Sequence, residues 1–550
     1  MYNFKLDMAN ALSNQLQLMM KTWMTILAAG LLMSSCSNPG LPGDELVQAY
    51  ADSFNSTDNE LYANEFPNDK AADFMKANIP VFECPDKEFE KTYYFRWWTF
   101  RKHIRKIPGG HIITEFLPDV PWAQAYNSIS CAAMHHFKEG RWLKEPTYLR
   151  DYADFWFFGE GNPRQYSFPA ADALWQFYLV TRDSSIIEKF YKPLCENFAC
   201  WKETHRDSTG LYWQQDGKDG MELSVGGGGV FGPESNGYRA TINSYMCADA
   251  KALSKMASML GCADDAGLWL KEAEEIKTRM DSALWDDEAE FYKVMPVGAD
   301  TLVSCRELHG YTPWVYDIPD EDKGVAWAQL FDPEGFKAPF GPTTAEQRNP
   351  GFKLSYEGHE CQWNGPSWPY STSQTLNGMA ACIQRFGEEF ITREQYLEQL
   401  RCYSSSHRLG GVCWIDENIN PHTGDWIART RLMTWENGTW SDSKGGVERG
   451  KDYNHSTFCD LVISGLFGVL PQADGSILVS PLIPDEEWNW FCLTGLHCAG
   501  HELTIQYDKT GHHYGAGRGY RIFVDGKQVF HSAKPQKYTF KGSSPVSGLS

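Results

Sequence analysis

Between residues 46 and 470, apolar residues recur mostly at the spacing of an amphipathic helix, and clusters of Gly, Pro and Asn separate the apolar runs. The clearest predicted helices cover residues 170–180, 186–201, 245–260, 268–284, 368–386 and 458–466. No strands alternate with these helices, so a parallel α/β fold is not indicated. We therefore expect a mainly α fold of helical hairpins closed on themselves, with the unusual residues on several longer loops.

The pattern changes after about residue 475. Short segments at 476–480, 502–507, 520–524 and 528–530 alternate apolar and polar residues, and Asp525-Gly526 between the last two is a hairpin signal. We therefore predict a helical domain over residues 46–474 and a small C-terminal β-sandwich over residues 475–550.

The first residues have the features of an export signal. Lys21 precedes an apolar run at 23–33 that is too short to span a bilayer, and Ser34-Ser35-Cys36 follows it. A Cys after small residues at this point resembles the bacterial lipobox, in which that Cys is lipidated. We expect a signal peptide over 1–36, lipidation at Cys36, a tether over 37–45, and anchoring to the bacterial outer membrane, on its periplasmic or cell-surface face. The alternative is ordinary signal cleavage nearby with a free Cys36.

Composition excludes some partners. A net charge of -21 argues against binding to nucleic acid or anionic membrane surfaces, which leaves the lipid as the expected membrane contact. The 21 Trp residues suit a sugar-binding cleft, but a large helical core also uses such rings. The cysteines after Cys36 form no CxxC pair and no Cys/His cluster at zinc spacing, so we expect no disulfide framework and no structural metal. One or two bridges remain compatible with an exported protein.

Two segments far apart in the chain each place a carboxylate among aromatic, Gly and Asn residues. Glu222 lies in Gly-Met-Glu-Leu-Ser at 220–224, and Glu417 lies in the segment 414–424. Hydrolysis of a glycosidic bond needs one protonated carboxyl and one ionised carboxylate, without a metal or cofactor. We take Glu222 as the candidate acid and Glu417 as the candidate base. The competing interpretation is two ordinary surface carboxylates among 71 acidic residues.

These segments resemble a known group of enzymes. Glu417-Asn-Ile-Asn-Pro-His-Thr-Gly at 417–424 is similar to the Glu-Asn-Tyr-Asn-Pro-x-Thr-Gly base segment of the six-hairpin glycosidases of glycoside hydrolase family 63, the trehalases and the mannosylglycerate hydrolases. The segment at 220–224 resembles their Gly-Met-Asp-Asn-Ser acid motif, with Glu222 and Leu223 in place of Asp and Asn, so Asp219 is the alternative acid. A third block at 362–369 resembles the Trp-Arg-Gly-Pro-x-Trp signature of family 63, with Asn364 in place of Arg.

The resemblance implies an (α/α)6 barrel, a six-hairpin toroid, and an exo-acting, inverting glycoside hydrolase of poly- or oligosaccharides without a cofactor. The protein is expected to be a monomer. Side chains that we predict to bind the sugar are those with stacking rings or hydroxyl-binding groups in or near these blocks: Arg96, Trp97, Trp98, Asp119, Trp122, Gln362, Trp363, Asn364, Trp368, Trp414 and His455. For each of the positions outside the three blocks, core packing or a helix cap is the competing interpretation.

Two alternatives belong to other functional classes. A polysaccharide lyase on a helical toroid would use Tyr, His and Asn, and Tyr453-Asn454-His455 supplies those residue types. A non-catalytic glycan-binding surface lipoprotein would need the Trp residues and the anchor but no pair of carboxylates. Unsaturated products would indicate the lyase, and binding without turnover would indicate the receptor.

Overall fold

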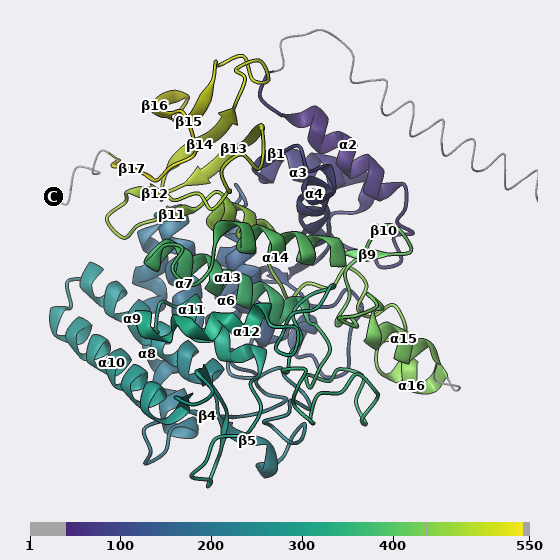
Figure 1. Cartoon of the computed structure of the whole chain (residues 1–550), viewed down its shortest axis with the longest axis vertical. Helices are drawn as coiled ribbons and strands as arrows, with labels where there is room; N and C mark the ends of the chain where they lie inside the picture. The colour runs from purple at the N-terminus through teal and green to yellow at the C-terminus, as the bar shows by residue number, and fades with distance from the viewer. Residues whose placement is uncertain (1–39, 435–437, 543–550) are drawn as a thin grey trace, which may run out of the picture.

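The computed structural model describes residues 40–434 and 438–542, and helices are the main regular element of this part of the chain (Figure 1). The predicted Cys36 site therefore lies outside the described residues. The helices of the first half are α2 (Asp44–Asn55), α3 (Ala71–Asn78), α4 (Lys87–Lys102), α5 (Ala133–Gly140), α6 (Thr147–Phe158), α7 (Ala170–Thr181), α8 (Ser184–His205), α9 (Ala240–Met259) and α10 (Ala263–Leu284). Those of the second half are α11 (Thr312–Val315), α12 (Ala328–Phe331), α13 (Pro369–Phe386), α14 (Arg393–Ser406), α15 (Ile427–Thr434), α16 (Gly438–Ser443) and a π-helical turn at Leu461–Leu466.

The helical periodicity predicted α7, α8, α9, α10 and α13 correctly, with ends within a few residues. Local signals fix several of these ends. The Asp183 side chain accepts a hydrogen bond from the backbone N–H of Ser185 at the start of α8. Thr392 and Gln395 form a capping box at α14. Helix α13 begins with Pro369, whose missing N–H is not needed in the first turn.

Six helical segments contact one another in a closed sequence. Helix α5 contacts α7, α7 contacts α9, α9 contacts α11, α11 contacts α13, and α13 contacts the turn at Leu461–Leu466. The sixth segment returns to α5, because the Glu139 carboxylate accepts hydrogen bonds from the backbone N–H groups of Phe458, Cys459 and Asp460. Arg141 adds an ion pair to Asp460 at 2.7 Å. The last segment of the series is therefore joined to the first by hydrogen bonds and an ion pair.

The C-terminal region is built from antiparallel strands, as the alternating pattern predicted. The larger sheet has the order β1-β13-β14-β15-β16, and the smaller sheet has the order β11-β12-β17. Their bounds are β1 (Val81–Glu83), β11 (Val469–Pro471), β12 (Ile477–Val479), β13 (Trp490–Cys498), β14 (His501–Asp508), β15 (Gly519–Val524), β16 (Lys527–Ser532) and β17 (Tyr538–Phe540). Asp525 and Gly526 join β15 to β16 with φ values of 50° and 73°, which confirms the predicted hairpin.

One edge of the larger sheet comes from the other end of the chain. Strand β1 pairs with β13 in antiparallel register, with Val81 opposite Thr494 and Glu83 opposite Cys492. Figure 1 shows the sheet beside α3 and α4, close to the start of the described chain. The sequence analysis assigned all strands of this region to residues after 475, so it did not foresee the contribution of β1.

Short strands join the loops between the helices. These are β2 (Ile104–Ile107), β3 (Gly110–Ile113), β4 (Trp213–Gln215), β5 (Asn236–Tyr238), β6 (Trp285–Asp286), β7 (Phe291–Tyr292), β8 (Met295–Pro296), β9 (Arg408–Leu409) and β10 (Val412–Cys413). Within the described residues, every cysteine is a free thiol. In the same part of the chain, no helix is long and apolar enough to cross a bilayer.

Candidate active site

A cavity of about 200 Å³ lies among the loops that precede the inner helical segments. Its wall combines carboxylates with aromatic rings. The lining residues are Glu115, Phe116, Trp122, Ile129, Cys131, Tyr166, Gly220, Glu222, Phe231, His359, Glu360, Cys361, Trp368, Tyr370, Glu417, Lys444, Arg449, Tyr453 and His455. Both candidate catalytic carboxylates, Glu222 and Glu417, therefore lie on the same cavity.

Backbone hydrogen bonds join the three blocks that the sequence analysis singled out. The N–H of Trp363 donates to the carbonyl of Glu222 at 2.9 Å. Ser367 and Ile419 exchange two backbone hydrogen bonds, at 3.0 and 2.9 Å. The third block thus lies between the segments that contain the two carboxylates and holds them in one unit.

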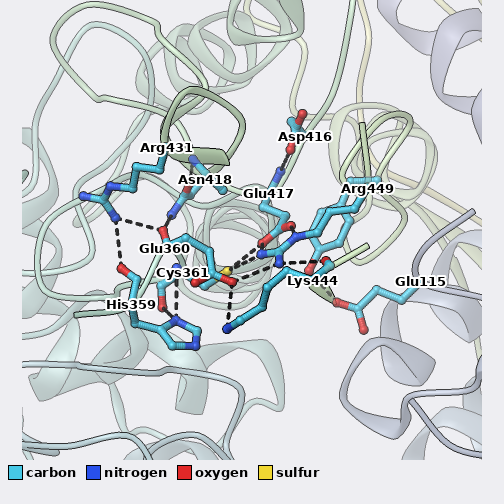
Figure 2. A network of polar contacts seen from close by, with 12 residues as sticks. Glu115, His359, Glu360, Cys361, Asp416, Glu417, Asn418, Arg431, Lys444 and Arg449 are labelled. Carbon is cyan, nitrogen blue, oxygen red and sulfur yellow. Dashed lines mark hydrogen bonds and ion pairs between the residues drawn. The ribbon is translucent and has the colours of Figure 1, made fainter. Parts of the chain in front are cut away.

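Glu417 is almost completely buried and paired with an arginine (Figure 2). Arg449 donates from Nε to Oε1 at 2.5 Å and from Nη2 to Oε2 at 3.1 Å, and the Cys361 thiol donates to Oε2 at 2.7 Å. A carboxylate has about four acceptor positions, so these three donors leave one for a further partner such as water. The guanidinium of Arg449 thus places a positive charge against both oxygens of Glu417.

The backbone that follows Arg449 lies close to Asp416, the residue before Glu417. The Asp416 carboxylate accepts a hydrogen bond from the Glu417 N–H at 2.8 Å, and burial raises the pKa of Asp416 to about 7. A side chain at position 450 would collide with the Asp416 carboxylate, so Gly450 permits this approach. The approach positions the guanidinium of Arg449 against Glu417.

Glu360 extends the network on the other side of Arg449. Its Oε1 accepts from Arg449 Nη1 at 2.9 Å and lies 3.3 Å from Lys444 Nζ. The donor atoms of His359, Glu360 and Cys361 lie within 4.8 Å of one another, close enough to hold a metal ion. A cation there would have to displace two ion pairs from Glu360, and Cys361 already donates its proton to Glu417. The contacts therefore fit an ion-pair network better than a metal site (Figure 2).

Glu222 lies in a tight loop with a different electrostatic environment. Gly220 and Leu223 have φ values of 79° and 58°, so the chain turns sharply on both sides of Glu222. Asp216 stabilises the turn by accepting from the N–H and the hydroxyl of Ser224, at 2.8 and 2.7 Å. Burial raises the pKa of Glu222 to about 8, and Asp216 adds to this rise. Glu222 is therefore a carboxyl that keeps its proton near neutral pH.

Glu115 is a third carboxyl in the cavity, and the sequence analysis did not identify it. It follows β3 and is 4% exposed. The Tyr453 hydroxyl donates to its Oε1 at 2.5 Å, and burial raises the pKa of Glu115 to about 8. The signal that could have found it is a single charged residue two positions after an apolar strand, but such residues are common.

Aromatic rings cover the remaining wall of the cavity. Trp368 and Tyr370 lie at the start of α13, with the His455 ring 5.9 Å and 5.3 Å from them. Both ring nitrogens of His455 are buried and have no hydrogen-bond partner within the described residues. Burial holds the pKa of His455 well below its usual range, so the neutral ring offers one donor and one acceptor to a ligand.

Trp122 and Asp119, two other predicted sugar-binding residues, differ in their position relative to the cavity. Trp122 lines the cavity, and the guanidinium of Arg449 lies 5.0 Å from its ring centre. Asp119 lies outside this cavity and is paired with Arg105 at 2.8 Å, with its side chain 75% exposed.

The predicted group at 96–98 does not reach the cavity, because helix α4 is buried in the core. Arg96 contacts the Tyr403 hydroxyl, His407 Nε2 and the Ser456 carbonyl, at 3.3, 3.1 and 2.8 Å. Trp97 is fully buried. The indole N–H of Trp98 donates to Asn55. These contacts correspond to the competing interpretation, core packing.

Several predicted residues support the cavity from behind. Trp363 stacks on Trp368 at 4.4 Å between ring centres but does not itself line the cavity. Gln362 donates to Asn364 at 2.8 Å, and its carbonyl accepts from the indole N–H of Trp368. Trp414 donates to Asp416 at 3.3 Å. We interpret these four side chains as positioning residues.

Asp219, the alternative acid, does not line the cavity. One of its oxygens accepts a hydrogen bond from Thr241 on α9, and the other is buried without a partner within the described residues. Of the two acid candidates, only Glu222 therefore faces the space where a substrate would bind.

Paired carboxyls in contrasting environments, set in an aromatic cavity on a helical scaffold, are the groups that hydrolysis of a glycosidic bond requires. Residues 125–456 match the mannosylglycerate hydrolase MGH1-like glycoside hydrolase domain, and residues 471–531 match the C-terminal domain of glycosyl hydrolase family 65. The chain belongs to the MGH1-like glycoside hydrolase family.

The chain is also similar in fold to solved structures. A protein named sialidase is 37% identical, with a TM-score of 0.84, and the match covers 90% of this chain and 44% of that one. A family 63 mannosylglycerate hydrolase from Thermus thermophilus, in complex with Tris, is 12% identical, with a TM-score of 0.50 and coverage of 68% and 100%. A family 78 rhamnosidase from a Bacillus species is 12% identical, with a TM-score of 0.50 and coverage of 78% and 40%. The chain thus spans less than half of the sialidase-named protein.

Proposed function

We propose that this protein is an exo-acting, inverting glycoside hydrolase with Glu222 as general acid and Glu417 as general base. The observation that supports this assignment most strongly is the contrast between the two carboxyls on one cavity. Burial raises the pKa of Glu222 to about 8, whereas Glu417 is bound by the guanidinium of Arg449. Contrasting surroundings of two carboxyls separate the acid from the base in glycosidases.

The proposed mechanism uses one proton donor and one proton acceptor. Glu222 gives its proton to the glycosidic oxygen as the bond to the anomeric carbon breaks. A water molecule at the remaining acceptor position of Glu417 gives a proton to that carboxylate and attacks the anomeric carbon from the opposite face. The products are a free alcohol and a sugar of inverted configuration, and the proton returns from Glu417 to Glu222 through solvent.

The size of the cavity supports exo action. Its volume of about 200 Å³ is below the range of about 300–1,000 Å³ that encloses drug-sized ligands. A single terminal sugar unit fits such a space better than the interior of a polysaccharide. The match covers less than half of the sialidase-named protein, so that name supports glycosidase chemistry here without supporting a particular sugar.

We also propose that the six contacting segments are the inner helices of an (α/α)6 barrel, followed by a small β-sandwich. The closed sequence of contacts from α5 to the turn at Leu461–Leu466 supports the barrel. All six inner segments are preceded by loops, and the catalytic cavity draws its lining from loops at that end.

The test compares two amide variants on two kinds of substrate. A panel of oligosaccharides and aryl glycosides first identifies the sugar. Glu417→Gln should lower turnover on every substrate by about 10²- to 10⁴-fold or more, because the base has no replacement. Glu222→Gln should lower turnover on natural glycosides equally, but should spare dinitrophenyl glycosides, whose leaving group needs no proton.

Asp219→Asn is the matched control, because it alters a carboxyl in the same loop region that does not line the cavity. If this variant showed the leaving-group contrast and Glu222→Gln did not, Asp219 would be the acid. Proton NMR of the first product reports its configuration, and retention would exclude the inverting mechanism. Ultraviolet-absorbing unsaturated products would indicate a lyase instead.

A further inference from the structure

A second and larger cavity lies inside the ring of inner helices, away from the catalytic loops. It has a volume of about 570 Å³ and shares no lining residue with the catalytic cavity. Side chains of α5, α7, α9 and α13 form its wall, together with residues 315–317 and Ser464. Strands β11 and β12 close one side through Leu470, Pro471 and Leu478. We call this space the axial cavity.

The axial cavity is basic although the whole chain has a net charge of -21. Two carboxylates, Asp172 and Asp317, face five basic side chains on its wall, which are Lys138, Arg141, Lys251, Lys255 and Arg385. A concave site with a surplus of one sign of charge focuses the field and attracts small ions of the other sign.

Some of these cations already have partners. Arg141 pairs with Asp460 at 2.7 Å, and Lys251 donates to the carbonyls of Tyr316 and Asp317, at 3.2 and 3.1 Å. The ammonium group of Lys138, by contrast, has no hydrogen bond or ion pair within residues 40–434 and 438–542. Burial lowers the pKa of Lys138, which is the direction expected for a cation without a bound counter-ion.

Two buried polar atoms on the same wall also lack partners. Gln374 uses its Nε2 to donate to the Tyr245 hydroxyl at 2.8 Å, but its Oε1 accepts nothing within the described residues. The Nε2 of His135 is also buried and has no hydrogen-bond partner within the described residues. Gln374 and His135 are 6% and 3% exposed. A buried polar group without a partner costs about 1–3 kcal/mol, so each indicates a ligand or ordered water.

A favourable interaction with a helix dipole explains the position of only some of these basic residues. Arg385 lies in the last turn of α13 and Lys138 in the last turn of α5, where a cation is favourable. Helix α9 has no basic residue in its last turn, and its Lys251 and Lys255 lie further inside the helix. The surplus of charge is therefore not just a consequence of helix ends.

We propose that the axial cavity binds a small polyhydroxylated anion, an acidic sugar unit, at a site separate from the catalytic cavity. The cations on its wall pair with the anionic group. The free Oε1 of Gln374 accepts from a sugar hydroxyl, because it cannot accept from a carboxylate. A volume of about 570 Å³ lies within the range of small-molecule sites.

The anionic group can be a carboxylate or a phosphate, and the test distinguishes them. Isothermal titration calorimetry of the full chain is run with glucuronate, glucose 1-phosphate, inorganic phosphate and neutral glucose. We expect saturable binding of at least one of the two sugar anions, and weaker binding of inorganic phosphate and glucose. Lys138→Gln should weaken the binding about tenfold or more, because a hydrogen bond to a charged group is worth about 1.5–3 kcal/mol.

Lys255→Gln, at an exposed residue, should also weaken binding, and within the described residues it removes no hydrogen bond that the fold needs. The matched control is Lys192→Gln on α8, whose side chain is 86% exposed, and it should bind as the wild type does. Glu222→Gln should also bind normally, which separates this site from the catalytic cavity. Absence of saturable binding by both sugar anions would overturn the proposal. The proposal would also be overturned if Lys138→Gln and Lys255→Gln both bound the sugar anions as tightly as the wild type does, or if Glu222→Gln lost the binding.

Discussion

Replacing Glu115 with glutamine removes a buried titratable group while keeping its shape and an acceptor for the Tyr453 hydroxyl. Burial raises the pKa of Glu115 from its ordinary value of 4.5 to about 8. The folded protein therefore holds a proton at this site over a pH range in which the unfolded chain has already lost it. By linkage, the stability that the protonated Glu115 carboxyl contributes is fully present below its pKa in the unfolded chain. This contribution is lost as pH rises through its pKa in the folded protein.

The size of this effect follows from the same values. Each pKa unit corresponds to about 1.4 kcal/mol, so Glu115 should cost the wild type about 4 kcal/mol more at pH 9 than at pH 5. Glu115→Gln has no such proton to lose. The variant should therefore gain stability relative to the wild type as pH rises, although its activity falls if Glu115 contacts the substrate.

The assay is urea unfolding followed by tryptophan fluorescence, for both proteins at several pH values between 5 and 9. Only the difference in unfolding free energy between variant and wild type is used, because the other buried carboxyls titrate in both proteins. Glu203→Gln on the exposed face of α8 is the control and should show a constant difference. If the Glu115→Gln difference also stayed constant over this range, the carboxyl would not be protonated in the folded protein, and the reasoning would fail.

Two further predictions concern other parts of the chain. Arg449→Lys removes the guanidinium fork that holds both oxygens of Glu417. In steady-state kinetics, kcat should therefore fall about 10- to 100-fold while KM changes far less. An unchanged kcat would show that the guanidinium does not position the base. We also propose that the protein is exported and lipid-anchored. The wild type should partition into detergent and have an acyl mass at Cys36, whereas Cys36→Ala should remain in the aqueous phase. A mature wild-type protein without this modification would contradict the proposed anchor.

Local patterns predicted much of the fold. The periodicity of apolar residues depends on near neighbours in the chain, and it placed α7, α9 and α13 correctly. The hairpin at Asp525-Gly526 needed only the turn preference of those two residues. The closure of the helical segments depends on contacts such as those of Glu139 with residues 458–460, which no local pattern reveals.

In the candidate site too, local sequence predicted some residues, whereas others depend on contacts between distant parts of the chain. Glu222 and Glu417 were found through short motifs, and the structure brings both to one cavity. Glu115 and Arg449 escaped attention because each gains its character from a distant partner, Tyr453 for one and Glu417 for the other. Residues 96–98 have the chemistry of a sugar-binding group, but residue type alone does not distinguish a cavity wall from a packed interior.

The pairing of β1 with β13 has a consequence for the order in which the protein forms. During synthesis, residues 81–83 emerge long before residues 492–494, which supply their hydrogen-bonding partners. Until the last part of the chain is made, β1 presents an unpaired edge beside the apolar face of α4, a surface that favours association between nascent chains. Completion of the N-terminal helical region therefore waits for the C-terminal sheet, and the two regions mature together as one unit.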